Sequence, residues 1–492
     1  MRRNVLWLLA ILVSFSCGGG DGGGASDTGA GDLGLDSSMP TDLVDSAGDA
    51  AGGDIQRDEV SLDLAETGAG DVDAGDTGGE DSQGDVLVDA DTSDYVPPGP
   101  CEGQAIARVL VDEGDETFDL GPYLMQLEPT SVVVMWRTLE GSDGVVVVKP
   151  KAGGEELSFV DDSAGPIHEV EVMGLEADTD YLYQVESNGV KSAWHTMHTA
   201  VPKGMPFTFV AWGDNQNGPE IFKEVVKLMI GVGPHLAVGV GDHVQTGKNA
   251  ELWKDELFGP ARALFHQVPF YAAMGNHEQN AQHYRDLYSY PHPVDDPVHE
   301  SYYWYTYGNA FFLVLDTNTL LCPLGEVDVP QSEFIKAALE TPEAKNATWR
   351  IAYAHEPAYS ESWSPGDCKY DGFLCVRNWV VPLLDSHEFH VWMSGHAHVY
   401  ERGTVGGVQH LIIGGGGGGL DEWCKDWEQT SVVYQDHHFL SVEAGCDQLR
   451  IEGVNLSGEV FDWVVVNKER EIVEQGPVEG LPELIISSDA PK

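Results

Sequence analysis

Hydrophobic and polar positions divide the chain into one stretch without periodicity and two stretches with different periods. From residue 101 to about residue 203, short runs of β-branched residues alternate with turns rich in glycine and aspartate. The runs at residues 132–136 and 145–148 are typical of strands, because β-branched side chains pack well on a pleated surface. This region therefore predicts a β-sandwich of about 100 residues.

Residues 174–183 support the same prediction. They read Gly-Leu-Glu-Ala-Asp-Thr-Asp-Tyr-Leu-Tyr, which resembles the corner between two strands of a fibronectin type III domain. In that case Tyr181 would be the corner tyrosine and Trp136 the core tryptophan. Taken alone, such a module is as often a spacer or a binding domain as part of an enzyme.

Residues 204–470 alternate between strand-like and helix-like segments, which predicts an α/β fold with helices layered around buried sheet. Strands are expected at residues 207–212, 236–240, 270–274, 311–315, 350–353 and 390–393. Helices are expected at residues 220–230, 251–257 and 331–339. The glycine run at residues 414–419 predicts a tight loop at a strand end, since no helix-opening nucleotide motif surrounds it. Residues 471–492 are expected to form a C-terminal tail.

The first 17 residues are typical of a secretory signal peptide. Arg2 and Arg3 are basic, residues 5–13 are apolar, and small residues lead to Cys17. The apolar run is too short to span a bilayer. Residues 14–18 resemble a bacterial lipobox, although Ser14 stands where leucine is usual, so we expect Cys17 to carry a lipid. The alternative is ordinary cleavage near Cys17, which would release a soluble protein.

Residues 18–100 consist mainly of Asp, Gly, Ala, Ser and Thr, with Tyr95 as the one aromatic residue. Few apolar groups and many like charges predict a disordered, extended linker. The alternative of a calcium-binding tract lacks the regularly spaced acidic loop that such sites use. A lipid followed by such a linker would hold the folded part away from an outer-membrane or cell surface.

Charge and cysteine content narrow the possible partners. The formal net charge of −55 disfavours nucleic-acid binding and electrostatic docking on anionic lipid, so membrane contact is expected only through the lipid anchor. Of the seven cysteines, those other than Cys17 form an even set, which suggests disulfides in an exported protein. Their pairing is open, although Cys368 and Cys375 are close enough in sequence to close one loop.

Polar residues recur at one place in the α/β region, directly after the predicted strands. Strand ends along one edge of such a sheet form a common crevice, so we expect these side chains to converge. Glycines precede four of them and let the backbone turn sharply. The residues are Asp214, Asp242, Asn276, His355, His396 and His398.

This set of donors predicts a metal centre. Carboxylate and amide oxygens together with imidazoles suit Zn, Mn or Fe, and Asp242 is the natural carboxylate to be shared between two ions. A single histidine after a strand is in most proteins a core or surface residue, so the prediction depends on the ordered series. His437 and His438 are expected in a late strand or its turn, and His243 is expected to point away from the site.

The series resembles the calcineurin-like metallophosphoesterases. Together with the preceding sandwich and the Gly-Pro-Tyr-Leu-Met-Gln stretch at residues 121–126, it resembles their purple acid phosphatase branch. The resemblance implies a four-layer α/β/β/α catalytic domain behind an N-terminal fibronectin III-like sandwich. The motifs that carry it are Gly213-Asp214, Gly241-Asp242, Gly275-Asn276-His277-Glu278, His355 and Gly395-His396-Ala397-His398.

The resemblance also implies the roles of the site residues. A first divalent ion would be bound by Asp214, Asp242 and His398, and a second by Asp242, Asn276, His355 and His396. His277 would stand at the open side, where it would stabilise transition-state charge or protonate the leaving group. The implied chemistry is hydrolysis, in which hydroxide held by two ions of Fe, Mn or Zn attacks phosphorus without a covalent phosphoenzyme.

The chain departs from the purple enzymes at three places. Gln245 stands where they have the tyrosine that binds iron, and Gln216 stands where other metallophosphoesterases have a histidine ligand. The loop at residues 359–365 contains no histidine, whereas the purple enzymes carry histidines there. Either glutamine could supply an amide oxygen to the first ion, and neither stabilises a trivalent ion as a phenolate does.

The sequence therefore predicts an exported, metal-dependent phosphoesterase that acts on phosphate monoesters of small molecules or proteins, with Asp242 and His277 central to catalysis. Two alternatives remain: a phosphodiesterase with the same core, and a non-catalytic surface lipoprotein whose sandwich is a binding module. The retained His277 argues against the second alternative, as does a ligand set that leaves positions for water and substrate.

Overall fold

The computed structural model describes residues 98–486, apart from residues 162, 292–299, 320–328, 479 and 482. The predicted signal peptide, Cys17 and all but the last three residues of the predicted linker lie outside the described residues. No helix within the described part of the chain is long and apolar enough to cross a membrane.

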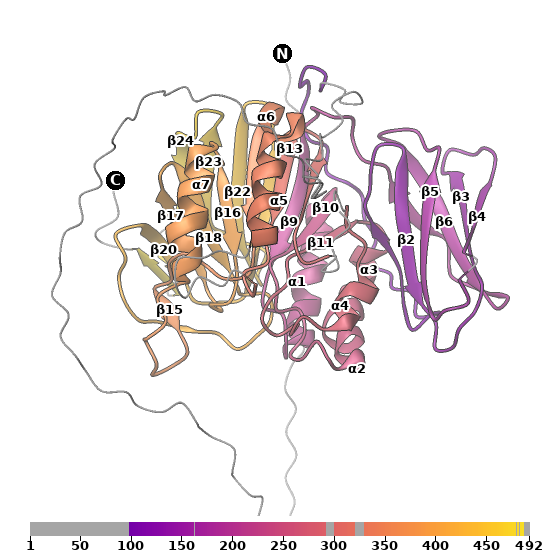
Figure 1. Cartoon of the computed structure of the whole chain (residues 1–492), viewed down its shortest axis with the longest axis horizontal. Helices are drawn as coiled ribbons and strands as arrows, with labels where there is room; N and C mark the ends of the chain where they lie inside the picture. Colours follow the sequence, from indigo (N-terminus) through magenta and orange to yellow (C-terminus); the bar gives the residue numbers. More distant parts are fainter. Residues whose placement is uncertain are drawn as a thin grey trace, which may run out of the picture. The chain divides into compact units, whose positions relative to one another are not determined.

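Two antiparallel sheets form the N-terminal β-sandwich, drawn in purple in Figure 1. The first sheet has the order β1-β2-β5 and the second the order β4-β3-β6-β7, with β8 also paired to β6. The strands are β1 (Leu120–Met125), β2 (Ser131–Arg137), β3 (Gly144–Pro150), β4 (Leu157–Asp161), β5 (Ile167–Met173), β6 (Asp180–Ser187), β7 (Val190–Lys191) and β8 (His195–His198).

Two predicted landmarks of the sandwich are present. The side chain of Trp136 is fully buried, stacks on His168, and donates its indole N–H to Ser187 Oγ at 2.9 Å. The hydroxyl of Tyr181 accepts a hydrogen bond from the backbone N–H of Glu176 at 2.9 Å, which is the expected corner contact. The fibronectin III-like prediction is thus confirmed at its most specific residues.

Two larger sheets form the following domain. Among the described residues, one has the order β11-β10-β9-β21-β22-β23-β24 and the other β12-β13-β14-β16-β18-β17-β20-β25. The first comprises β9 (Phe207–Trp212), β10 (Leu236–Gly239), β11 (Phe270–Ala272), β21 (His438–Ala444), β22 (Gln448–Asn455), β23 (Val460–Asn467) and β24 (Ile472–Gln475). The second comprises β12 (Tyr303–Tyr307), β13 (Ala310–Val314), β14 (Trp349–Tyr353), β16 (Val391–Ser394), β17 (Tyr400–Val405), β18 (Val408–Ile413), β20 (Thr430–Tyr434) and β25 (Leu484–Ile486).

Side chains that alternate along the strands show how the layers pack. On β13, Phe312 and Val314 belong to the core between the two sheets, whereas Phe311 and Leu313 pack with residues of the helices that cover the second sheet. On the other side, Phe222 of α1 lies 5.3 Å from Trp212 of β9 between ring centroids. The two sheets therefore pack against each other, and helices cover the outer face of each sheet (Figure 1). This arrangement confirms the predicted four-layer α/β/β/α fold.

Of the three predicted helices, one differs from the prediction, and the described residues also contain four short α-helices, α3, α4, α6 and α7, that were not predicted. The predicted helix at residues 251–257 is a short α-helical turn that continues as a wider π-helix, Trp253–Phe258. A second π-helical segment, Val376–Val380, leads into α7. The α-helices are α1 (Pro219–Val232), α2 (Ala250–Leu252), α3 (Arg262–Phe265), α4 (Gln282–Leu287), α5 (Val329–Glu340), α6 (Pro342–Asn346) and α7 (Val381–Ser386).

The region after residue 470, expected as a tail, contributes strands to both large sheets. β24 pairs with β23 and β25 pairs with β20, both antiparallel. Strands of three or four residues are too short for their alternation to be recognised in sequence, and their partners determine where they form.

The disulfides correct another expectation. Cys368 is bonded to Cys424, not to its sequence neighbour Cys375, which is itself in a disulfide. Antiparallel pairing of β15 (Ser362–Trp363) with β19 (Glu422–Trp423) brings the chain segments of Cys368 and Cys424 together. A second bond joins Cys101 to Cys446 across 345 residues.

Peptide mapping of the unreduced protein is expected to recover the cross-links Cys101–Cys446 and Cys368–Cys424. The double variant Cys368→Ser/Cys424→Ser is expected to lose about 2–4 kcal/mol of unfolding free energy, because the unfolded chain gains conformational freedom. Denaturant unfolding under non-reducing conditions measures this loss. Recovery of a Cys368–Cys375 peptide would contradict the assignment.

Candidate dinuclear metal centre

The predicted donor residues lie where the ends of strands from both large sheets meet. Asp214, Asp242 and Asn276 follow β9, β10 and β11, which are parallel neighbours in the first sheet. His355 follows β14 and the two remaining histidines follow β16, which are parallel neighbours in the second sheet. The site therefore combines one edge of each sheet, as the placement of these residues after strands predicts.

The backbone at this edge is sharply turned. Asp214, Asp242 and His396 have φ of 60°, 53° and 70°, a left-handed region that non-glycine residues rarely occupy. A Cβ atom at Gly275 would clash with the carboxylate of Asp242, and one at Gly395 would clash with that of Asp214. The glycines are therefore required for the close approach of backbone to carboxylate.

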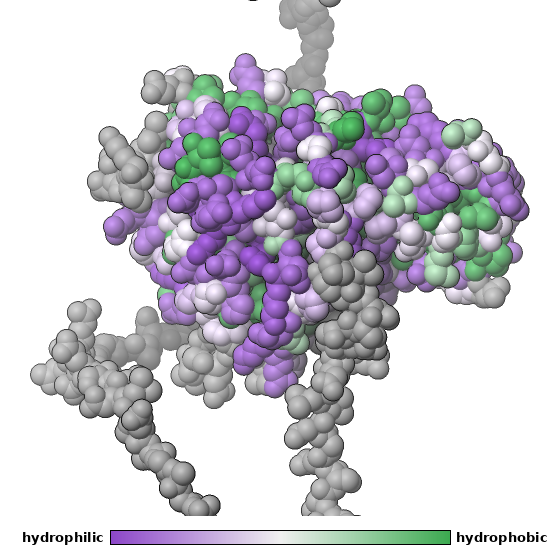
Figure 2. Space-filling model, turned by 90° about the horizontal axis from the view of Figure 1, so that it is seen from above, coloured by the Kyte–Doolittle hydropathy of each residue, from purple (hydrophilic) through white to green (hydrophobic). Residues whose placement is uncertain are grey.

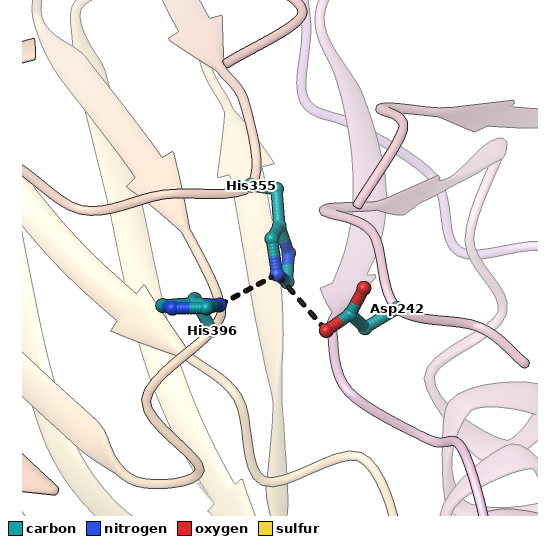
Figure 3. Close-up of side chains that lie close together, drawn as sticks. All are labelled: Asp242, His355 and His396. Carbon is teal, nitrogen blue, oxygen red and sulfur yellow. Dashed lines mark hydrogen bonds and ion pairs between the residues drawn. The ribbon is translucent and has the colours of Figure 1, made fainter. Parts of the chain in front are cut away.

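His355 lies at the centre of the first group of donors. Its Nε2 atom is 3.0 Å from Asp242 Oδ2, 3.0 Å from Asn276 Oδ1 and 3.1 Å from His396 Nδ1. Figure 3 shows the His355 ring between the side chains of Asp242 and His396. Ligand atoms of Asp242, His355 and His396 all lie within 4.8 Å of one another.

Hydrogen bonding fixes which atom of His355 faces this cluster. Its Nδ1–H donates to the carbonyl of Val240 at 3.0 Å, so Nε2 is the ring nitrogen that faces the other donors. A carboxylate oxygen, an amide oxygen and imidazole nitrogens then converge on one point. Such a set of acceptors fits a cation.

The electrostatics of the cluster lead to the same conclusion. Although burial opposes a charge on His355, the carboxylate of Asp242 and its hydrogen bond raise the pKa of His355 to about 10. Burial, offset in part by His355, and the charge of Asp242 raise the pKa of Asp214 well above its usual range. Two carboxyl groups in one buried place favour a positive charge beside them, and divalent metal ions would supply it when bound.

Asp214 and His398 form a second pair of donors beside this cluster. His398 Nε2 lies 3.5 Å from Asp214 Oδ1, and the other ring nitrogen of His398 donates to the carbonyl of Gly419. The amide nitrogen of Gln216 is 3.2 Å from His398 Nε2, while its oxygen is buried without a partner among the described residues. A half-turn of this amide would direct its oxygen toward the histidine and the carboxylate.

Of the two glutamines considered as ligands, only Gln216 borders His398 in this way. The side-chain oxygen of Gln245 accepts a hydrogen bond from Asn217 at 2.6 Å. Gln245 instead contributes its backbone carbonyl, which accepts the Nδ1–H of His277 at 2.8 Å.

His277 stands at the open side of the cluster. Its backbone N–H donates to Asp242 Oδ1 at 2.8 Å, and its Nε2 lies 4.0 Å from Asp242 Oδ2. The side chain is 31% exposed, in contrast to those of Asp242 and His355, which are buried. This position leaves Nε2 available to a bound molecule.

Glu278 has a role in the site that the sequence did not predict. The carboxylate of Glu278 is fully buried and accepts the backbone N–H groups of Asp242, His243 and Gly275 at 3.0, 2.7 and 2.7 Å. It therefore joins the loops after β10 and β11, which carry Asp242 and Asn276. The sequence shows only an acidic residue directly after the predicted Asn276 and His277.

The histidines expected outside the site are indeed elsewhere. His243 is fully buried, lies 5.5 Å from the Phe270 ring and donates its Nδ1–H to Asn215 Oδ1 at 2.9 Å. Burial lowers the pKa of His243 to about 3, so it is a neutral core residue. His438 is the first residue of β21.

Comparison with known families agrees with this geometry. Residues 207–400 match the calcineurin-like phosphoesterase family, and residues 122–199 match the N-terminal domain of purple acid phosphatases. The first match contains all six predicted donors, and the second covers most of the β-sandwich.

Individual relatives are distant in sequence. The chain is 22% identical over 360 residues to the Fe(3+)-Zn(2+) purple acid phosphatase 12 of Arabidopsis thaliana, covering 68% of this chain and 72% of the relative. It is 22% identical over 358 residues to a purple acid phosphatase of Glycine max, covering 67% and 72%. An uncharacterized protein of Mycobacterium tuberculosis is 21% identical over 359 residues, covering 58% and 67%.

Solved structures share the fold. The purple acid phosphatase PPD1 from yellow lupin seeds superposes with a TM-score of 0.58 at 17% identity, covering 70% of this chain and 74% of that one. PhoD superposes with a TM-score of 0.54 at 15% identity, covering 77% and 95%.

Fold, donor set and family matches together define a metal-dependent phosphoesterase of the calcineurin-like class. The N-terminal domain matches that of purple acid phosphatases, and one relative from Arabidopsis thaliana is named an Fe(3+)-Zn(2+) purple acid phosphatase. The assignment of the six donors to two ion positions remains a prediction.

Asp242→Ala is expected to remove nearly all metal of both ions, because its buried carboxylate is the one donor predicted to be shared. His277→Ala, which removes no predicted ligand, is expected to keep the metal and to lower kcat by about 10²–10⁴, the contribution of one acid–base group. Elemental analysis and steady-state kinetics on the two purified variants test this division. Equal metal loss in both would contradict it.

The iron-loaded protein is expected to be colourless, because Gln245 occupies the position of the iron-binding tyrosine and its side chain is engaged by Asn217. A neutral amide does not stabilise a trivalent ion as a phenolate does, so two divalent ions are expected. Visible absorption spectra recorded before and after reduction show whether the protein has the absorption band of an iron-bound tyrosine. A band that disappears on reduction would refute the expectation.

Proposed function

We propose that this chain is an extracytoplasmic phosphatase that hydrolyses phosphate monoesters of small molecules or proteins. The observation that carries the proposal is the position of His277 Nε2, exposed at the open side of the donor cluster and 4.0 Å from Asp242 Oδ2. A purely structural metal site is usually closed by protein ligands, whereas this one leaves a reactive group next to an accessible edge.

The predicted ligands would hold two divalent ions, which, when bound, activate water and neutralise the charge of the phosphoryl group. The chain's own residues then handle the proton. The Nδ1–H of His277 is held by the carbonyl of Gln245, so Nε2 is the atom that can donate a proton to the leaving oxygen. The backbone N–H of His277 also donates to Asp242 Oδ1. This bond fixes the position of His277 relative to the carboxylate that is predicted to be shared between the ions.

Preference for monoesters is supported by the phosphate chemistry and by the names of the relatives. A monoester dianion offers one more charged oxygen to two cations than a diester does, so it is bound more strongly by the same centre. The relatives from Arabidopsis thaliana and Glycine max are named as purple acid phosphatases.

Export from the cytoplasm is supported by the disulfides and the N-terminal sequence. Cys101–Cys446 and Cys368–Cys424 are bonds that persist in oxidising compartments. The signal-like segment ending at Cys17 supports a lipid-anchored form, through which alone we expect membrane contact. The face visible in Figure 2 is mainly hydrophilic. The formal net charge of −55 disfavours binding to nucleic acid, because phosphate groups would be repelled.

A matched pair of substrates tests the proposal. Metal-free protein is supplied with Mn, Zn or Fe(II) and assayed with p-nitrophenyl phosphate and bis(p-nitrophenyl) phosphate, which share one leaving group. At least about tenfold higher kcat/KM for the monoester is expected, a difference of about 1.4 kcal/mol in the barrier. Asp242→Ala is the negative control. Faster hydrolysis of the diester would favour the alternative of a phosphodiesterase.

A further inference from the structure

Two aromatic side chains adjoin the donor cluster and are not among the predicted ligands. The ring centroids of Trp363 and Tyr370 each lie 5.1 Å from that of His396, and the two rings are 4.3 Å apart. His396 Nδ1 is in turn 3.1 Å from His355 Nε2. One imidazole ring therefore separates the aromatic pair from the centre of the cluster.

The loop that carries this pair is held in place at several points. Trp363 ends β15 and pairs with Glu422 of β19, and the disulfide of Cys368 lies two residues before Tyr370. The hydroxyl of Tyr370 donates a hydrogen bond to Glu356 Oε2 at 3.5 Å. Glu356 directly follows the predicted ligand His355 in the chain. The rings are thus set beside the site before anything binds, which limits the conformational entropy that binding costs.

Neither ring is completely used by packing within the chain. Trp363 rests against a small cluster that includes Ala397 and Val399, yet both Trp363 and Tyr370 remain partly exposed. The loop is also the place at which the chain lacks the histidines of the purple enzymes.

We propose that Trp363 and Tyr370 form an aromatic subsite that binds the planar ring of an aryl phosphate monoester. The inference rests on the proposed function, since it assigns the organic part of the same substrate. Because only one imidazole ring separates the pair from the cluster, it suits a ring attached directly to the ester oxygen. A nucleotide, in which a ribose intervenes, would carry its base farther away.

The test uses non-hydrolysable phosphonates that differ only in planarity. Kd values of phenylphosphonate and cyclohexylphosphonate are measured by calorimetry on the metal-loaded full chain, together with its metal content. The wild type is expected to bind the phenyl compound about tenfold more tightly. Trp363→Leu should reduce this ratio to about one, with unchanged metal content and little change for cyclohexylphosphonate. Trp363→Phe should restore most of the ratio.

Trp194→Leu is the matched control, because Trp194 is a partly exposed tryptophan of the sandwich, and it should keep the wild-type ratio. An unchanged ratio in Trp363→Leu would overturn the inference. Metal loss with equal weakening of both phosphonates would also overturn it, since Trp363 would then only support His396. Failure of the metal-loaded wild type to bind either phosphonate would refute the proposed phosphatase function itself, and the subsite with it.

Discussion

The convergence of acceptor groups around His355 Nε2 is the constraint on which the rest of the site depends. Asp242, Asn276 and His396 approach this atom with a carboxylate oxygen, an amide oxygen and a ring nitrogen. In a buried place, lone pairs and negative charge repel one another without water to screen them, so the cluster attracts positive charge. Divalent cations between the donors would supply this charge, so the geometry fits a metal site.

Holding this arrangement requires a rigid and locally strained backbone. Three donors, Asp214, Asp242 and His396, lie in left-handed conformations, each of which costs of the order of 1–3 kcal/mol. The sheet edges on which they stand are fixed by the buried layers on both sides. Glu278 adds a further restraint, since its carboxylate binds three backbone N–H groups of the loops that carry two donors. Strain and restraint are thus concentrated where the chemistry requires fixed positions.

The two sides of the site are built differently. One side uses carboxylates, imidazoles and His277, all on short loops after strands. Beside His396 lies a longer loop with Trp363 and Tyr370, whose position depends on a two-residue strand pair and on the Cys368–Cys424 bond.

The layered fold and the positions of the six predicted donors after strands could be read from local patterns in the chain. β9 covers the predicted residues 207–212, and each predicted donor follows a strand whose hydrophobic run is evident in the chain. The folded structure was needed to show which glutamine borders His398, that Cys368 bonds Cys424, that Glu278 joins two loops, and that Trp363 and Tyr370 adjoin His396. These features link segments far apart in the chain, and no local pattern encodes which distant segment will pack beside which. The short strands β24 and β25 belong with them, since three or four residues become a strand only when a neighbouring strand supplies the hydrogen bonds.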